Sequence, residues 1–502
     1  MNRLFTLIFL SGWLLASSAA LAQLEQVQRM EFDLPSQGDE EYEVLTLGSD
    51  GVLVTRKKTE YYAGTPLQWH FTKYDMDLKT VWETDLKVKA SMQPLLTYHN
   101  GHYLYWLFGE VDSEKINILR LHLDTGDQEL IEGELLAVSD VSHFKVLGNT
   151  AFVAGHYRDR AVVVRFDFFS RQSRVLPGLY VNHLEVSSLE VDETINELSV
   201  TVTTTRRGRC QLSLRTYSYE GKLLQETALP GEEGRTMLSG KVVPLGKGES
   251  LLVGTYSANC SPYAQGVYVA RTGSLPNEAD RTAVKYLEFS QFKNFFNYLK
   301  PSRRQRVMER IARKKDEGKE AHFRYLMLVH DLIPTADGFL LVAEAYFPQY
   351  RNASASLMPF GRPGADRSLD GFRYTHALIG GFDKTGKLLW DNSFAMPDVM
   401  SYELEEQVQV TQQANGQLVL AYPVEDKINT IVLRGSEVLR EKEELELAPK
   451  TGLQRILSTE NTSLAAWHNH YFLAWGIQRK AADRANPARD VFYLNKLSYP
   501  LR

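Results

Sequence analysis

The 502-residue chain has almost no cysteine, no strong excess of either charge and, after its first residues, no long apolar run. A segment needs about 20 consecutive apolar residues to span a bilayer, so we expect the mature protein to be soluble. The formal net charge is only −5, from 57 basic and 62 acidic side chains. This balance predicts no overall attraction to nucleic acid or to an anionic membrane.

Recognised catalytic motifs are also missing. Neither the G-x-S-x-G elbow of hydrolases nor the G-x-G-x-x-G loop of dinucleotide-binding proteins occurs. The segment 381–387 matches most of a phosphate-binding loop, but Leu388 stands where that motif needs a Ser or Thr to hold Mg²⁺. We therefore interpret this segment as a turn between two strands. The sequence predicts no catalytic residue and no cofactor.

The start of the chain has the features of an export signal. Arg3 supplies a positive charge, residues 4–15 are mostly apolar, and Ala20-Leu21-Ala22 is a small-x-small cleavage site. The apolar stretch is too short for a transmembrane anchor. We predict a signal peptide over residues 1–22, a mature chain from Gln23, and a location in the periplasm or outside the cell.

A repeat occupies the rest of the chain. Short runs of alternating apolar residues, separated by Gly, Asn and Asp, indicate many antiparallel strands. The clearest unit is a tight turn followed by a largely apolar strand, as in Asn100-Gly101 before residues 103–106. Asn-Gly and Asp-Gly suit hairpin turns because they tolerate positive φ. The spacing of roughly 40 to 50 residues is typical of propeller blades. The eight turns begin at Ser49, Asn100, Gly148, Asn196, Lys247, Asp337, Asn415 and His468.

The last repeat lacks a fourth strand, and the start of the mature chain supplies one. The eighth copy stops after its third strand at residues 491–497, whereas Arg29 to Pro35 has the pattern of a fourth strand. Pairing the two would close a ring and cover exposed strand edges. In this respect the chain resembles the β-propeller superfamily over residues 24–500. The resemblance implies an all-β, eight-bladed propeller in one domain, 23–502; seven blades is the alternative if the weak fourth copy is discounted.

The segment at about 293–322 interrupts the repeat. We expect a helix from Arg303 to Glu317, with Ser302 as its N-cap and Gly318 as its stop signal. The segment has ten basic residues against four acidic ones, and aromatic residues are frequent at its start. The alternative interpretation is a plain surface helix whose apolar side chains pack on the propeller.

Two long loops, at about 348–374 and 477–490, also carry arginines. Loops between second and third strands leave a propeller on the same face as the connections between blades, so we expect these loops and the helical insertion to share a face. Arginine and aromatic side chains are enriched where partners bind. A solvated surface without a partner is the alternative. The predicted binding residues are Arg206, Arg207, Arg209, Arg303, Arg304, Arg306, Arg310, Arg351, Arg362, Phe360 and Tyr374.

The only two cysteines, Cys210 and Cys260, fall in corresponding loops of blades four and five. In an oxidising compartment such a pair can form a disulfide, provided that the two Cα atoms lie within about 7 Å. We predict this bond, with two free buried thiols as the alternative.

Three histidines, His143, His183 and His330, fall early in inner strands and are weak candidates for a metal site at the ring axis. Polar residues there also line a wet channel without binding anything, and no ligand motif supports a metal. We therefore predict a non-catalytic binding or scaffold protein of the cell envelope, whose basic face engages an acidic protein or an anionic glycan. The alternative is an enzyme acting on polysaccharide at the mouth of the central channel.

Overall fold

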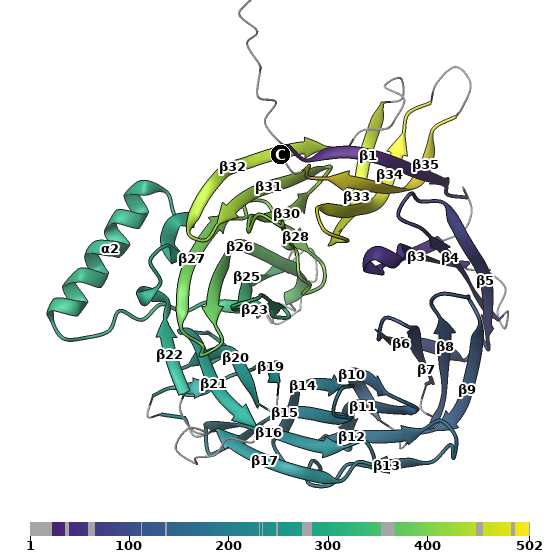
Figure 1. Cartoon of the computed structure of the whole chain (residues 1–502), viewed down its shortest axis with the longest axis horizontal. Helices are drawn as coiled ribbons and strands as arrows, with labels where there is room; N and C mark the ends of the chain where they lie inside the picture. Colours follow the sequence, from purple (N-terminus) through teal and green to yellow (C-terminus); the bar gives the residue numbers. More distant parts are fainter. Residues whose placement is uncertain are drawn as a thin grey trace, which may run out of the picture.

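The predicted hairpin turns produce antiparallel sheets that follow one another around a ring (Figure 1). The computed structural model describes residues 23–35, 40–58, 66–111, 113–135, 138–229, 231–232, 234–246, 249–273, 284–352, 367–447, 455–482 and 487–500. Eight sheets form eight blades, so the prediction of an eight-bladed propeller is confirmed and seven blades are excluded. The predicted signal peptide lies outside the described residues.

In most blades the strands follow in chain order from the inside of the ring outwards, whereas blade eight takes its outermost strand from the start of the chain (Figure 1). Blades one to four contain β2 (Glu40–Thr46), β3 (Val52–Lys58), β4 (Leu67–Tyr74) and β5 (Thr80–Val88); β6 (Met92–His99), β7 (Tyr103–Glu110), β8 (Lys115–His122) and β9 (Gln128–Glu134); β10 (Ser139–Leu147), β11 (Thr150–Tyr157), β12 (Arg160–Asp167) and β13 (Ser173–Val175); and β14 (Leu184–Asp192), β15 (Glu197–Arg206), β16 (Arg209–Ser218) and β17 (Leu223–Leu229). Blades five and six contain β18 (Thr236–Met237), β19 (Lys241–Gly246), β20 (Glu249–Ser257), β21 (Gly266–Gly273) and β22 (Val284–Glu288); and β23 (Leu326–Val329), β24 (Ile333–Pro334), β25 (Gly338–Asn352), β26 (Arg367–Asp383), β27 (Leu388–Ala395) and β28 (Met400–Ser401). Blades seven and eight contain β29 (Gln409–Gln412), β30 (Leu418–Val424), β31 (Lys427–Arg434) and β32 (Glu437–Glu446); and β33 (Ile456–Ala466), β34 (Tyr471–Lys480) and β35 (Arg489–Ser498), joined by β1 (Glu25–Asp33).

The second strand of each blade is the part that is packed between neighbours. In β7 the five residues from Leu104 to Phe108 are all buried. Tyr105 and Leu107 pack towards blade three, whereas Trp106 packs towards blade one. Full burial of a side chain of this size contributes roughly 1.5–3 kcal/mol. An uninterrupted apolar run is therefore the sequence signature of a strand with two buried faces.

Strand β1 closes the ring as the sequence predicted, although it begins at Glu25 and ends at Asp33. It pairs antiparallel with β35, from Glu25 opposite Ser498 to Asp33 opposite Val491. Its Arg29 is only 6% exposed. The guanidinium of Arg29 donates to Gln478 Oε1 at 2.6 Å, which ties the first strand to the last blade.

The insertion between blades five and six begins with two short 3₁₀ helices, η2 (Phe289–Gln291) and η3 (Phe295–Tyr298), and continues as helix α2 (Pro301–Asp316). The predicted N-cap was wrong, because Pro301 is already helical and Lys300 occupies the cap position. Proline is favoured in the first turn, where its missing N–H is not needed.

The predicted end of the helix was right. Gly318 adopts φ +66°, and its N–H donates to Lys315 O while the N–H of Lys319 donates to Lys314 O. These two bonds form a Schellman closure, which needs a residue with positive φ. Among the described residues, no helix combines the length and the apolar composition needed to cross a membrane.

The predicted loop at 348–374 is strand at both of its described ends. Strand β25 continues to Asn352 and β26 begins at Arg367, and the two pair along this length with bulges near Tyr346 and Tyr350. Aromatic residues favour extended strands, and Gly371, with φ +139°, accommodates the irregular register. The tip between these strands, with Phe360 and Arg362, lies outside the described residues.

The loops between second and third strands and the connections between blades leave the ring on one side, because the strands of each blade alternate in direction. Helix α2, however, does not cover that face. Figure 1 shows it outside the ring, beside β22 and β27. The helical insertion is therefore a projection from the rim of the propeller.

Candidate functional site

Aromatic residues fasten the insertion to the propeller. Phe289, Phe292, Phe295 and Phe296 are at most 3% exposed and pack among the apolar residues of blades five and six. The sequence left open whether this segment binds a partner or packs on the propeller, and these four aromatic side chains pack on the propeller. They form the core contact that fixes the base of α2.

A buried carboxylate on β27 strengthens this attachment. Asp391 is 3% exposed and accepts hydrogen bonds from the backbone N–H groups of Lys293, at 2.9 Å, and Asn294, at 2.6 Å. Burial raises the pKa of Asp391, and these two N–H groups oppose that rise. The start of the insertion is thus held by both apolar packing and backbone hydrogen bonds.

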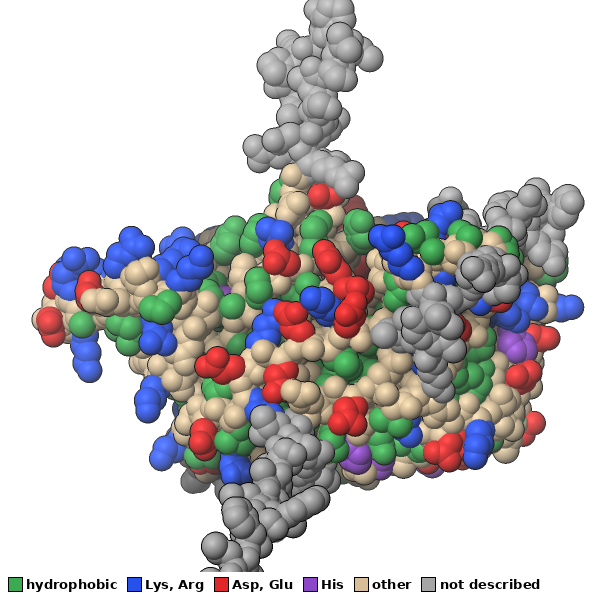
Figure 2. Space-filling view, turned by 90° about the horizontal axis from the view of Figure 1, so that it is seen from above, with side chains coloured by type: hydrophobic (Ala, Val, Ile, Leu, Met, Phe, Trp, Pro, Cys, Tyr) green, Lys and Arg blue, Asp and Glu red, His purple; other side chains and the backbone are tan. Residues whose placement is uncertain are grey.

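Beyond this base, α2 is exposed. None of its side chains is buried, although Val307 and Ile311 pack partly against the body of the protein. The helix has seven basic and two acidic residues. Figure 2 shows Lys and Arg side chains gathered on the projecting part at the left, where Figure 1 places α2.

Four of these basic residues form a stripe along the helix. Arg303, Arg306, Arg310 and Arg313 recur every three or four residues, which places them on one side of a helix, and all four are exposed. Over the ten residues from the first to the last, a helix rises by about 15 Å. We call these four residues the arginine stripe.

The arginine stripe keeps its charge. Among the described residues, none of the four arginines takes part in an ion pair. The ion pairs of the insertion join Lys314 and Lys319 to Glu317, Arg235 to Glu320, and His322 to Glu288. Arg310 lies over the ring of Phe323, with 5.3 Å between the guanidinium carbon and the ring centre. This contact orients the side chain without neutralising it.

An open cavity of about 470 Å³ lies at the C-terminal end of α2. Its walls contain three cationic side chains as well as a carboxylate and an imidazole. The lining residues are Arg310, Lys314, Lys319, Glu320, Ala321 and His322. The stripe and the cavity together give the projecting insertion an excess of basic over acidic side chains.

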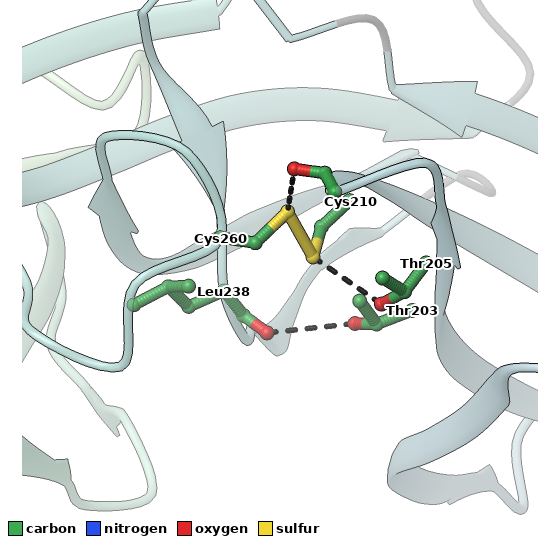
Figure 3. Close-up of a disulfide and its surroundings, with 6 residues drawn as sticks. Thr203, Thr205, Cys210, Leu238 and Cys260 are labelled. Carbon is green, nitrogen blue, oxygen red and sulfur yellow. Dashed lines mark hydrogen bonds between the residues drawn. A yellow bond between two sulfur atoms is a disulfide. The ribbon is translucent and has the colours of Figure 1, made fainter.

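The basic tip predicted in blade four lies elsewhere on the ring. Arg206 and Arg209 close the β15–β16 hairpin and are exposed, as is Arg207 in the turn. Cys210 follows this turn and forms a disulfide with Cys260 in blade five, with 5.5 Å between the Cα atoms. The predicted bond is confirmed, and it joins two neighbouring blades at their loops (Figure 3).

Tyr374 does not belong to a binding surface. It is 2% exposed and packs in the core between blades six and seven. Its hydroxyl donates to Glu405 O at 2.5 Å, and burial raises the pKa of Tyr374 to about 12. The sequence interpretation placed this residue in a loop, whereas it lies in strand β26. Arg351 lies in β25, opposite Ser368.

The three candidate histidines do not form one site. His183 is exposed in a turn before β14, His143 is half-buried in β10, and His330 is 5% exposed between β23 and β24. Among the described residues, a group of three ligand atoms close enough to share a metal occurs at Glu288, Glu320 and His322 and includes none of the three.

His330 instead belongs to a buried ion pair. Its Nε2 lies 2.8 Å from Glu344 Oε1, and Glu344 is fully buried. The same oxygen accepts from the backbone N–H groups of Gln407 and Val408, at 2.9 and 2.7 Å. These bonds fasten blade six to the first strand of blade seven. The sequence signal that was missed is a single acid inside an apolar strand.

Charge around this pair controls the protonation of His330. Burial lowers its pKa, but the hydrogen bond to Glu344 and the charges of Glu344, Glu406 and Asp331 outweigh burial and raise it. Asp331 in turn pairs with Lys241 of blade five at 2.6 Å. This network spans three blades around the axis of the ring.

The fold and the site define an eight-bladed β-propeller with a basic helical projection. No family model matches the chain, and no curated protein matches its sequence. Solved structures with a similar fold include the β-propeller domain of the Trilobed protease from Pyrococcus furiosus, with 10% identity, a TM-score of 0.35, and coverage of 82% of this chain and 96% of that one. The polysaccharide lyase Uly1 has 10% identity, a TM-score of 0.40 and coverage of 80% and 89%. The Dos1 propeller has 12% identity, a TM-score of 0.36 and coverage of 86% and 94%. At these identities the likeness is one of architecture and transfers no activity.

Proposed function

We propose that this protein is an exported binding scaffold of the cell envelope that engages an anionic glycan through the arginine stripe of α2. The observation that carries the proposal is a helix held firmly at its base by buried phenylalanines. Its exposed length displays four arginines that form no ion pair with any described residue. Guanidinium groups bind carboxylates and sulfates in a bidentate manner. A preorganised row of them suits an extended chain with regularly spaced negative charges.

A glycan fits this surface better than an acidic protein does. Protein interfaces depend on buried aromatic or aliphatic anchors, and the exposed length of α2 offers only one large apolar side chain of this kind, Met308, which is 47% exposed. Binding to a polyanion through charge alone needs no such anchor. The disulfide between Cys210 and Cys260 supports export, because disulfides persist in oxidising compartments.

The enzyme alternative receives less support. It required the three histidines to meet near the ring axis, but only His330 is part of a buried polar network there. Its imidazole is engaged with Glu344. We therefore do not extend the proposal to a catalytic activity.

The test compares two triple charge reversals with the same change in net charge. Arg303→Glu, Arg306→Glu and Arg313→Glu alter the stripe, and Arg206→Glu, Arg207→Glu and Arg209→Glu alter the exposed tip in blade four. We expect the first variant to lose roughly tenfold or more in affinity for alginate or a sulfated glycan, and the second to lose less than about twofold. Binding is measured by calorimetry at two salt concentrations, since screening should weaken it.

Poly-glutamate is titrated in parallel. If the unaltered protein binds poly-glutamate but no glycan, and the stripe variant loses that binding, the result would assign the surface to an acidic protein instead. If the two triple variants lose the same amount of glycan affinity, the loss reflects the change in net charge alone. The proposal that α2 is the binding site would then be wrong.

A further inference from the structure

Three potential metal ligands meet at the base of the insertion. Glu288 ends β22, just before the insertion, and Glu320 and His322 follow α2 on its return to blade six. One ligand atom from each of these side chains lies within 4.8 Å of the other two. The chain thus brings residues from both ends of the insertion to a single point.

The ligand closest to the core is Glu288, which is 3% exposed. Burial and the charge of Glu320 raise the pKa of Glu288, while His322 and Ser290 lower it. A carboxylate in this position needs a cation, because burying a charge without compensation is costly. His322 contacts this carboxylate, with Nδ1 at 2.9 Å from Glu288 Oε1.

The second carboxylate is only partly neutralised. Arg235 Nη2 lies 3.2 Å from Glu320 Oε1. The same guanidinium also pairs with Glu232, at 3.0 Å. One arginine is therefore shared between two acids, and Arg310, Lys314 and Lys319 line the adjoining cavity.

We propose that Glu288, Glu320 and His322 bind a zinc ion. An imidazole nitrogen and two carboxylate oxygens are ligands that zinc accepts, at about 2.0–2.2 Å. Calcium and magnesium prefer all-oxygen sites, and imidazole favours zinc over both. The metal would replace the direct contact between His322 Nδ1 and Glu288 Oε1.

Three protein ligands leave one tetrahedral position open. The cavity of about 470 Å³ adjoins Glu320 and His322 and gives water or an anion access to that position. Lys314 and Lys319 on its wall suit an anionic fourth ligand rather than a neutral one. None of the three proposed ligands belongs to the arginine stripe, although Arg310 of the stripe lies on the wall of the same cavity.

Zinc at this point would also act as a cross-link between the two ends of the insertion. It would join Glu288 to His322 and so close the loop that contains α2, and closing a loop in the folded state stabilises it. We therefore expect zinc to raise the melting temperature of the protein, as any ligand that binds only the folded state does.

The experiment uses the full mature chain without an affinity tag, stripped of metal by a chelator and dialysed. Zinc chloride is titrated by calorimetry, and bound zinc is counted by mass spectrometry after gel filtration. We expect one zinc ion per chain and a higher melting temperature. Calcium and magnesium chloride should produce neither effect.

Variants locate the site. His322→Gln and Glu320→Gln should each weaken zinc binding at least tenfold, and Glu288→Gln should do the same if it folds. His322 has a side chain that is 52% exposed, so its replacement keeps the test valid even if Glu288→Gln unfolds. Glu317→Gln is the matched control, because Glu317 has the same charge, lies three residues from Glu320 and is outside the group.

No stoichiometric zinc binding by the unaltered chain would overturn the proposal. Zinc binding that His322→Gln leaves unchanged would place the metal elsewhere and would also overturn it. If the unaltered chain binds zinc but no anionic glycan, only the proposed function is contradicted. If it binds the glycan but no zinc, only the metal site is contradicted.

Discussion

At the scale of single residues, the buried polar groups determine how the blades are joined. Glu344 is fully buried, and one of its oxygens accepts from His330 and from two backbone N–H groups of the next blade. Removing one partner of such a buried pair leaves an uncompensated charge and costs roughly 3–5 kcal/mol. This junction therefore matters more to the ring than the exposed ion pairs do, since those contribute about 0–1 kcal/mol.

The junction predicts a dependence of stability on pH. The pKa of His330 is raised in the folded state above the value of about 6.5 in an unfolded chain. Its protonation therefore stabilises the fold fully below about pH 6.5, and this contribution is lost as the pH rises through the folded-state pKa. We expect the difference in free energy of unfolding between the unaltered protein and His330→Gln to be largest near pH 6 and to shrink towards pH 9.

Urea unfolding at several pH values measures this difference, with His183→Asn as a control because His183 is exposed in a turn with φ +60°. The groups that face His330 from neighbouring elements, Lys241, Asp331 and Glu406, stay in place in both variants. A difference that is constant across this range, or that grows with pH, would contradict the assignment.

At the scale of elements, the disulfide joins two hairpins that share no hydrogen-bonded strand pair. Cys210 lies near the start of β16, just after the β15–β16 turn of blade four, and Cys260 lies between β20 and β21 of blade five. Around the bond, the Thr203 hydroxyl donates to Leu238 O at 3.5 Å (Figure 3). Cys260 Sγ also lies 3.4 Å from Gly208 O across the same boundary. Because the bond is a covalent link between the two blades at this point, we expect it to matter for their pairing.

Replacing both cysteines by serine should lower the free energy of unfolding by about 3–4 kcal/mol, because the closed loop has a sequence separation of 50 residues. Urea unfolding of the oxidised protein, of the reduced protein and of the double variant measures this. We expect the reduced protein and the double variant to agree. A double variant as stable as the oxidised protein would show that the bond contributes nothing to the fold.

Sequence patterns predicted the repeating elements well and the irregular ones less well. The apolar strands that follow turns such as Asn100-Gly101 can be recognised in the sequence, because a strand buried on both faces must be apolar throughout. The phenylalanines at 292, 295 and 296 left two interpretations open, because an aromatic residue in an insertion has the same sequence signature whether it binds a partner or packs on the body. Tyr374 was misjudged because a strand that extends beyond its blade has no turn signal at the expected place.

The candidate sites could be predicted only in part for a related reason. The stripe on α2 follows a helical period within one segment and is visible in the sequence. The group formed by Glu288, Glu320 and His322 depends on how the insertion returns to the ring, over more than 30 residues, and no local pattern encodes that return. His330 was noticed as a polar residue in an inner strand, but its partner Glu344 becomes evident only when the register of β23 and β25 is known.

At the scale of the whole molecule, the ring depends on one strand from the start of the chain. Strand β1 completes blade eight, and without it β35 would present an unpaired edge, which is a template for aggregation. Arg29 is the polar centre of this closure. Besides Gln478 it contacts Glu31 at 2.7 Å and lies over the ring of Tyr493, 4.7 Å from its centre.

Arg29→Ala should therefore weaken the whole ring. Its loss leaves Gln478 Oε1 without its donor and Glu31 dependent on Lys480 alone, so we expect the free energy of unfolding to fall by about 3–5 kcal/mol. Because the ring opens most easily where two distant parts of the chain meet, the variant should also form aggregates that light scattering detects at temperatures where the unaltered protein stays monodisperse. Arg206→Ala, at an exposed hairpin tip, should change neither property. If the two variants behave alike, the closure is held by the backbone pairing of β1 and β35 and by apolar packing, without a measurable contribution from the buried guanidinium.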